Sequence, residues 1–280
     1  MTDFAAQQPG LDPLALPPPG AIVEDIRQAR RRTAVRFALA FAITWIVLIG
    51  GMAVAIASTG RVHPDFLAEQ LPFFLGGVPL TIFVSVASII FATGFAVIGA
   101  LGRVSRNPVI YAIASLYVSL VRGTPLVVQI FFIYSALPQF GIVLPAIVAG
   151  VFALSFNYGA YMTEIFRAGI QAIPRGQLEA ASALGMTERH TMRRIVMPQA
   201  IRIVIPAIGN EFIAMIKDSS LVSVVGLQEL LWRADTVGRS NSQLIQALLI
   251  AAIVYWALTI FFSTFQARLE RRMALSDVRV

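Results

Sequence analysis

The longest stretch without a charged residue decides the fold class: it reads GTPLVVQIFFIYSALPQFGIVLPAIVAGVFALSFNYGAYMT and covers residues 123–163. A membrane-spanning helix needs about 20 mainly apolar residues, because the hydrocarbon core is about 30 Å thick and each residue adds about 1.5 Å. One helix cannot use the whole stretch. Pro138 and Pro145 interrupt it, which predicts two spans near residues 108–137 and 143–171.

Other apolar runs of spanning length lie on both sides of that stretch. They cover residues 37–57, residues 73–102, a run that begins near residue 203, and residues 241–267. The run that begins near residue 203 is interrupted by Glu211, Lys217 and Asp218, so it is the least regular of the set. The sequence therefore predicts an all-α integral membrane protein with about six transmembrane helices.

The composition supports this class and excludes several others. Hydrophobic residues make up 57% and charged residues 13% of the 280 residues, and the mean hydropathy is +0.76. Soluble domains contain roughly 45–50% apolar and roughly 25% charged residues. The lack of cysteine excludes disulfide bonds and a thiolate nucleophile, and His63 and His190 are far apart in sequence. We therefore expect no catalytic residue, no metal and no cofactor.

The basic residues predict the orientation of the helices. The net charge of +7 comes from 22 basic and 15 acidic residues, and the basic ones gather at the ends of apolar runs, which argues against a nucleic-acid surface. With both termini in the cytoplasm, the inner segments hold Arg27, Arg30, Arg31, Arg32, Arg36, Arg103, Arg106, Arg175, Arg189, Arg193, Arg194, Arg202, Arg268, Arg271, Arg272 and Arg279, and the outer segments hold Arg61, Arg233 and Arg239. This asymmetry follows the positive-inside rule.

The two ends of the chain carry polar tails. Residues 1–33 include LDPLALPPPG and have the composition of a disordered, proline-rich cytoplasmic tail. Residues 34–58 then form an extra N-terminal transmembrane helix. A cleaved signal peptide is the alternative, but both the charged leader and the apolar run are longer than such peptides have. At the other end, residues 273–280 are a short cytoplasmic tail.

One connection is much longer than the turns between the other spans. It covers residues 173–202 and reads IPRGQLEAASALGMTERHTMRRIVMPQAIR. Residues 177–184 favour a helix, which Gly185 ends because glycine readily adopts a left-handed backbone. Thr187 caps a second short helix, and Pro198 breaks that helix before the next span. The pattern predicts two short helices that meet at a glycine on the cytoplasmic side.

This connection resembles the EAA loop of the permease subunits of ABC importers. The residues that carry the resemblance are Glu179, Ala180, Ala181, Gly185, Ile195, Met197 and Pro198. The usual form ends in Leu-Pro, and methionine conserves the volume of leucine. Residues 122–129, RGTPLVVQ, are similar to the RGTPLLVQ signature of polar amino-acid importers of the histidine and glutamine permease type, and residues 161–167 and 215–221 match further blocks of that group.

The resemblance covers about residues 73–272. It implies the transmembrane domain of a type I ABC importer in a bacterial inner membrane, with five core spans to which the N-terminal helix is an addition. The chain has no GxxxxGK[ST] phosphate loop, and Lys217 is its single lysine, so we expect a non-enzymatic subunit. The implied partners are a cytoplasmic ABC ATPase dimer, a second permease subunit (a copy or a paralogue), an extracytoplasmic amino-acid-binding protein and membrane lipid.

The resemblance also implies which residues contact the ATPase. The expected set is Glu179, Ala180, Ala181 and Gly185, with Arg189, Arg193 and Arg194 at the rim. In such importers the short helix of the loop sits in a groove of the ATPase and transmits its closing to the spans, which gives alternating access. The alternative is an amphipathic loop that anionic lipid holds on the membrane surface.

Ionisable residues inside the spans are costly, so each needs an interpretation. Glu164 and Arg167 stand at positions i and i+3 of one helix, a spacing that permits an ion pair. Arg122 either extends toward the inner surface or pairs across the helix bundle. We interpret these three residues as members of structural ion pairs, and the alternative is a role in binding the substrate.

A second group of polar residues is a candidate substrate path. Glu211 and Asp218 share one face of a helix, and Asn210 and Lys217 share the adjacent face. Such a stripe can meet the ammonium and the carboxylate of an amino acid, although Lys217 and Asp218 can also simply neutralise each other. The remaining candidates are Asn157 and Tyr158, which alternatively hydrogen-bond a neighbouring helix.

Three other functions compete with this interpretation. An ion-coupled secondary transporter needs acids arranged for ion coupling and inverted repeats, and the sequence shows no convincing internal repeat. An ABC permease for a different small solute fits the loop equally well. A membrane-embedded enzyme is disfavoured, because the sequence has no metal-ligand cluster and no cysteine, and neither histidine lies in an apolar span. The sequence leaves the choice of amino acid and the choice between homodimer and heterodimer open.

Overall fold

The computed structural model describes residues 19–58 and 64–274, and in these ranges the chain is helical without a β-strand. The chain divides into two compact units, Met1–Val62 and His63–Val280. The first unit contains α1, a single helix over Pro19–Ala57. Residues 19–33 are therefore helical, where a disordered tail was expected, because no residue after Pro19 in this range interrupts a helix. The rest of that predicted tail lies outside the described residues.

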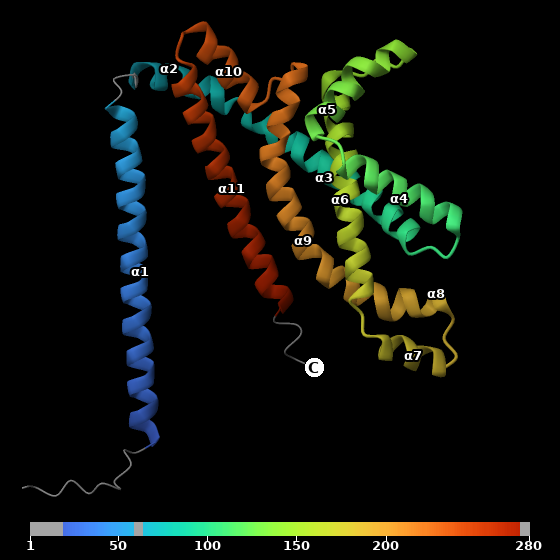
Figure 1. Ribbon diagram of the computed structural model, residues 1–280. Helices are drawn as coiled ribbons and strands as arrows, with labels where there is room; N and C mark the ends of the chain where they lie inside the picture. The colour runs from blue at the N-terminus through green and yellow to red at the C-terminus, as the bar shows by residue number, and fades with distance from the viewer. Residues whose placement is uncertain (1–18, 59–63, 275–280) are drawn as a thin grey trace, which may run out of the picture. The chain divides into compact units, whose positions relative to one another are not determined.

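The second unit contains the other helices (Figure 1). They are α2 (Pro64–Leu75), α3 (Val78–Arg103), α4 (Pro108–Arg122), α5 (Leu126–Phe131), α6 (Ala146–Gln171), α7 (Arg175–Ala183), α8 (Glu188–Thr191), α9 (Met197–Asp218), α10 (Leu230–Ser240) and α11 (Leu244–Ala274). Two π-helical turns, Phe132–Ala136 and Met192–Val196, and two 3₁₀ segments, Leu137–Phe140 and Ser219–Val225, connect some of them.

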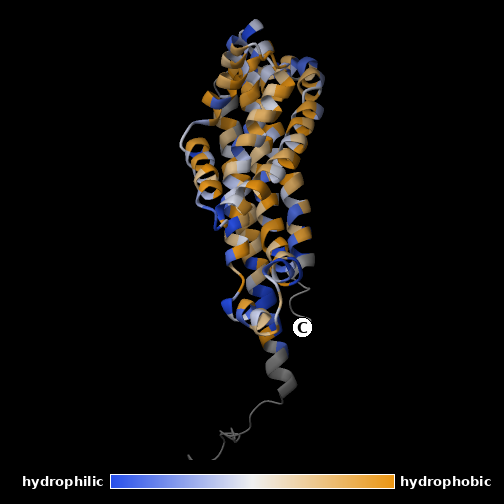
Figure 2. Cartoon of the chain, turned by 90° about the vertical axis from the view of Figure 1, so that its right-hand side faces the viewer, coloured by the Kyte–Doolittle hydropathy of each residue, from blue (hydrophilic) through white to orange (hydrophobic). Residues whose placement is uncertain are grey.

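Five helical stretches of the described chain are long and apolar enough to cross a membrane, or six if one bent pair counts as a span. Hydrophobic residues cover the middle of the long helices of the second unit (Figure 2). The expectation of about six spans is confirmed, but the span predicted near residues 108–137 is not one straight helix. It bends by 105° between α4 and the stretch Leu126–Phe140.

The break between α4 and α5 has a local cause. Gly123 follows the last residue of α4, and Pro125 precedes the first residue of α5. Proline has no backbone N–H and disfavours the helical conformation of the residue before it. Thr124 therefore cannot continue α4, and the chain turns. Hydropathy alone did not reveal this turn because Gly, Thr and Pro carry no charge.

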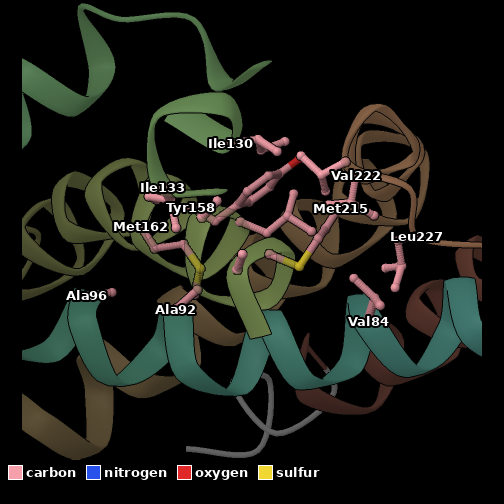
Figure 3. Close-up of a cluster of buried hydrophobic side chains, with 14 residues drawn as sticks. Val84, Ala92, Ala96, Ile130, Ile133, Tyr158, Met162, Met215, Val222 and Leu227 are labelled. Atoms are coloured by element: carbon pink, nitrogen blue, oxygen red, sulfur yellow. The ribbon is translucent and has the colours of Figure 1, made fainter. Parts of the chain in front are cut away.

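The core of the second unit lies where α3 crosses α6. Two glycines permit the close approach: a Cβ atom on Gly99 would lie 2.2 Å from Thr163 Oγ1, and one on Gly159 would lie 2.6 Å from Phe95 Cβ. Side chains from α3, α6, α9 and the helix after the break fill the space between them (Figure 3). The cluster contains Val84, Ala92, Ala96, Ile130, Ile133, Ala149, Ala153, Leu154, Tyr158, Met162, Met215, Val222, Val225 and Leu227.

A buried glutamate fastens α10 to its neighbours, at the end of the second unit opposite α7 (Figure 1). Glu229 is fully buried and caps α10, because its Oε1 accepts a 2.8 Å hydrogen bond from the Trp232 backbone N–H. Its Oε2 accepts from Tyr255 of α11 and from Thr81 of α3, the latter at 3.3 Å. Burial raises the pKa of Glu229, since desolvation disfavours the carboxylate.

We expect Glu229→Ala to lower the thermal stability of the purified chain. The substitution removes a helix cap and leaves the buried hydroxyls of Thr81 and Tyr255 without this acceptor. Losing the cap and stranding buried polar groups costs about 3 kcal/mol. Thermal unfolding in mild detergent measures the effect.

Glu229→Gln is the control, because it keeps an acceptor of the same shape and should cost much less. A raised carboxyl pKa gives stability that is complete below the ordinary glutamate pKa and is lost as pH rises through the raised value. The stability of the parent chain should therefore fall over that pH range, and the Gln variant should lack this component. Equal melting temperatures for Glu229→Ala and the parent would contradict the assignment.

Candidate functional site

The break between α4 and α5 forms one wall of a polar pocket of about 470 Å³. Its lining comes from the break, from the middle of α6 and from one face of α9. The lining residues are Arg122, Gly123, Thr124, Pro125, Leu126, Asn157, Tyr158, Tyr161, Glu211 and Asp218. The first four residues of the sequence signature, RGTP, therefore form this wall of the pocket. They face the same space as the candidate path residues of α6 and α9.

Gln129 holds the break in place. Its Nε2 donates hydrogen bonds to the carbonyl oxygens of Val121 (2.8 Å) and Thr124 (3.1 Å), and to Thr124 Oγ1 (2.8 Å). Its Oε1 accepts from Asn157 Nδ2 at 3.2 Å. One side chain thus satisfies carbonyl groups that the broken helix leaves without partners and joins the break to α6.

Two carboxylates lie on the α9 side of the pocket. Asp218 Oδ2 accepts a 2.8 Å hydrogen bond from the hydroxyl of Tyr158. Glu211 is half-buried and, within the described chain, has no hydrogen-bond or ion-pair partner. Glu211 is therefore the carboxylate that is available to a bound group.

A guanidinium group lies on the opposite side of the pocket. Arg122 is exposed, and its Cζ lies 5.1 Å from the centroid of the Tyr161 ring, a cation–π distance. The expectation of an ion pair for Arg122 was wrong: in the described part of the chain it contacts no carboxylate. The reason is the break, which places Arg122 at the pocket instead of inside a continuous span.

Glu164 forms the predicted ion pair with Arg167 and a second one with Arg103, which the sequence reasoning missed. Glu164 Oε1 contacts Arg103 Nε at 3.1 Å, and Glu164 Oε2 contacts Arg167 Nη2 at 2.7 Å. Arg103 also donates to Ser115 Oγ at 2.6 Å. This cluster joins α3, α4 and α6 near the end of α3. The signal in the sequence that could have identified Arg103 is its position directly after the apolar run over residues 73–102.

The candidate path residues divide into two groups. Asn157, Tyr158, Glu211 and Asp218 line the pocket. Asn210 and Lys217 do not: Asn210 Oδ1 accepts from Gln266 of α11 at 2.8 Å, and the Lys217 side chain is exposed. Tyr158 takes the place that Lys217 would have had beside Asp218. Tyr161 and Thr124 also line the pocket and were missed as pocket residues.

The connection over residues 173–202 folds into α7 and α8, as two short helices around a glycine. The backbone N–H of Met186 donates to the Ala181 carbonyl, and that of Gly185 donates to the Ser182 carbonyl, both at 3.0 Å. This is a Schellman ending, which requires the left-handed backbone that Gly185 adopts, with φ of +72°. Thr187 caps α8 by accepting from the His190 N–H.

Two details of this connection differ from expectation. Pro198 does not break a helix but lies in the first turn of α9, because the π-helical turn Met192–Val196 precedes it and absorbs the missing backbone hydrogen bond. Ala181 is 1% exposed, so it packs inward and is not part of an accessible surface. The exposed members of the expected contact set are Glu179, Ala180, Gly185, Arg189, Arg193 and Arg194.

Comparison with known proteins places this architecture among membrane transport components. A sequence model of the family described as binding-protein-dependent transport system inner membrane component matches residues 88–275. The probable amino-acid permease protein YxeN of Bacillus subtilis is 38% identical over 213 residues, which are 75% of this chain and 95% of that protein. The L-cystine transport system permease protein TcyB of the same organism is 40% identical over 217 residues, or 76% and 93% of the two chains.

A solved structure is similar over the same share of the chain. The crystal structure of an amino acid ABC transporter with histidines matches with a TM-score of 0.72 and 40% identity, over 75% of this chain and 99% of that one. The helix α1 lies outside the stretch that the family model matches.

We expect Gln129→Glu to damage the pocket although the side chain keeps its shape. A carboxylate cannot donate, so the carbonyls of Val121 and Thr124 would face an oxygen at about 3 Å instead of an N–H. The Val121 carbonyl is part-buried, and leaving such a group unsatisfied costs about 1–3 kcal/mol, so the thermal stability of the purified chain should fall measurably. Gln177→Glu, an exposed glutamine in α7, is the matched control and should melt close to the parent. A parent-like melting temperature for Gln129→Glu would show that the break does not depend on this amide.

Proposed function

This chain belongs to the family of binding-protein-dependent transport system inner membrane components, and we propose that it forms the translocation path of an ATP-driven importer for polar amino acids. The observation that carries the proposal is the pocket at the broken helix, which presents a guanidinium and an unpartnered carboxylate to one space. The amino-acid permeases among its relatives support the same substrate class.

The pocket suits the two charges that every amino acid carries. Arg122 is placed to bind the α-carboxylate, since a guanidinium can hold a carboxylate through two parallel hydrogen bonds. Glu211 is placed to accept from the α-ammonium, with Asp218 beside it. Asn157 and the hydroxyls of Tyr158 and Tyr161 offer uncharged polar contacts. A volume of about 470 Å³ lies in the range of small-molecule pockets.

The energy must come from a separate subunit, because the chain has no phosphate-binding loop. We infer that a cytoplasmic ATPase dimer docks on the exposed residues of α7 and α8 and that a soluble binding protein delivers the amino acid on the other side. A second permease subunit, a copy or a paralogue, completes the path. Closing of the ATPase would move α7 and α8 and alternate the access of the pocket.

The orientation follows from the charges and from one contact. Arg106, in the turn after α3, pairs with Glu188 of α8 at 2.9 Å, so this turn and the connection over residues 173–202 lie at the same end. Both are rich in arginine, and the positive-inside rule favours the cytoplasm for them. We infer that both chain termini are cytoplasmic as well. This contact is exposed and contributes little stability.

We expect Glu211→Gln and Arg122→Gln to weaken transport by raising KM. Glu211→Gln keeps the size of the side chain and Arg122→Gln shortens it, and each removes one charge-assisted hydrogen bond to the substrate, which is worth about 1.5–3 kcal/mol, or roughly a 10- to 100-fold change. The measurement is uptake of radiolabelled amino acids into proteoliposomes that contain the assembled importer.

Asp235→Asn is the matched control for these variants. It removes an acidic side chain on α10, outside the pocket, whose partner is Arg239 at 2.8 Å. This variant should transport with the parent KM. An unchanged KM in both pocket variants would reject the pocket as the substrate site, while an importer that accepts no amino acid at all would reject the wider proposal.

We expect Gly185→Asp to leave the chain inserted but to uncouple transport from ATP hydrolysis. The glycine is exposed with open space around it, so the new side chain would project at the ATPase and would strain a left-handed backbone. Copurification of the ATPase and ATP-driven uptake are the measurements. Gly141→Asp is the control, because Gly141 has φ of +81° and open space but lies in the loop before α6. Normal ATP-driven uptake by the Gly185 variant would overturn the docking assignment.

A further inference from the structure

The helix α1 carries a ring of positive charge just before its apolar part. Five arginines lie within residues 27–36, and each side chain is exposed. We call Arg27, Arg30, Arg31, Arg32 and Arg36 the arginine collar. We propose that the arginine collar binds the headgroups of anionic phospholipids in the inner leaflet and so makes α1 a lipid-selecting helix.

The part of the collar nearest the hydrocarbon core lies at the depth of the headgroup layer. Phe37, the residue after Arg36, begins a run without charge that extends to residue 60. Arg36 therefore lies at the edge of the hydrocarbon core, and Arg27 lies about 14 Å further out, at 1.5 Å per residue. The headgroup region on each side of a bilayer is about 5–8 Å thick. The collar spans this region and ends in the water beyond it.

The continuity of α1 makes the collar rigid. The helix has 39 residues and is about 58 Å long, nearly twice the thickness of the hydrocarbon core. The collar thus belongs to the same helix as the span and keeps a fixed distance from it. A flexible basic tail would not hold its charges at one depth.

The distribution of the charges around the helix identifies the occupant. Arg27 and Arg31 lie on one side, with Arg30 close to them, because residues four apart share a face. Arg32 and Arg36 also share a face, on the other side of the helix. A protein partner would meet one side, whereas lipid headgroups surround the helix. A collar that is charged all around therefore fits a lipid environment better than a protein surface.

The charge balance near the collar leaves it available to anions. Glu24 and Asp25 precede the collar, beside Arg27, and the sequence contains no acidic residue between positions 26 and 64, so the other four arginines have no acidic neighbour within three residues. Within the described part of the chain, no ion pair involves a member of the collar. Anionic headgroups are the complementary groups that a membrane supplies at this depth, and arginine matches a phosphate through two hydrogen bonds.

Trp45 provides a reporter for the test. It lies on α1 about 14 Å beyond Arg36 toward the bilayer centre, at 1.5 Å per residue, and its side chain is 44% exposed. The chain has three tryptophans, so Trp232→Phe with Trp256→Phe leaves Trp45 as the single fluorophore. The full-length protein is reconstituted in phosphatidylcholine bilayers that contain a fixed fraction of either brominated phosphatidylglycerol or brominated phosphatidylcholine. Quenching of Trp45 then measures which lipid surrounds α1.

We expect brominated phosphatidylglycerol to quench Trp45 several-fold more strongly than brominated phosphatidylcholine at the same fraction. Each surface arginine adds about a fivefold preference for an anionic membrane surface, and high salt should reduce the difference because it screens exposed charges. Arg30→Gln with Arg31→Gln and Arg32→Gln should remove most of the preference. The same arginines changed to lysine should retain it, and Arg268→Gln with Arg271→Gln on α11 should leave it unchanged.

Three results would overturn the proposal. Equal quenching by the two brominated lipids would show that α1 selects no anionic lipid. A preference that survives the Gln substitutions would place the selection elsewhere in the chain. A Trp45 that neither lipid quenches would show that protein surrounds α1. In each case the ATP-driven uptake of the same preparation reports separately whether the importer has assembled.

Discussion

The second unit depends on how the chain satisfies its backbone where a membrane helix is interrupted. In a bilayer, carbonyl and N–H groups that leave a helix find no water, so irregular backbone is tolerated only where protein or a polar cavity covers it. At the break between α4 and α5, Gln129 supplies donors to the carbonyls of Val121 and Thr124 and is itself held by Asn157. The break and the polar pocket are therefore one feature: the same geometry that exposes the backbone also creates the space that a polar solute requires.

One helical path connects this pocket to the surface proposed for the ATPase. The chain is helical without interruption from Glu188, in α8, through the π-helical turn and α9 to Val225. This path begins beside the Gly185 turn and carries Glu211 and Asp218 near its other end. A helix transmits a displacement along its axis, and the hydrogen-bonded Gly185 turn joins this path to α7. A push on α7 and α8 thus reaches the carboxylates of the pocket without a separate relay, which is how a non-enzymatic subunit can use energy released elsewhere.

The sequence predicted those parts of the structure that depend on hydropathy and on local backbone preference. The number of spans and the turn at Gly185 follow from such signals, because apolar length and a left-handed glycine act within one segment. The role of Arg103 and the inward position of Ala181 depend on which segments face each other, whereas the break at Pro125 has a local cause, the Gly-Thr-Pro sequence, that hydropathy does not register. Arg122 illustrates the difference: its residue type suggested an ion pair, but the bend of the chain decided its surroundings. Asn210 and Lys217 lie outside the pocket for the same reason, since a helical stripe shows which residues share a face and not what that face meets.

The arginines of the two units are positioned by different physical causes. In the second unit, Arg103 and Arg122 are placed by tertiary structure, one in an ion-pair cluster and one against the Tyr161 ring, so their roles depend on the fold around them. In α1, the arginines need no fold beyond a straight helix, because the bilayer itself supplies both the depth reference and the opposite charge. This explains how an added helix can carry a function although it lies outside the stretch that defines the family. Selection of the lipid around a transporter requires only that a rigid helix hold its charges at headgroup depth, and α1 meets that requirement by its length and its sequence alone.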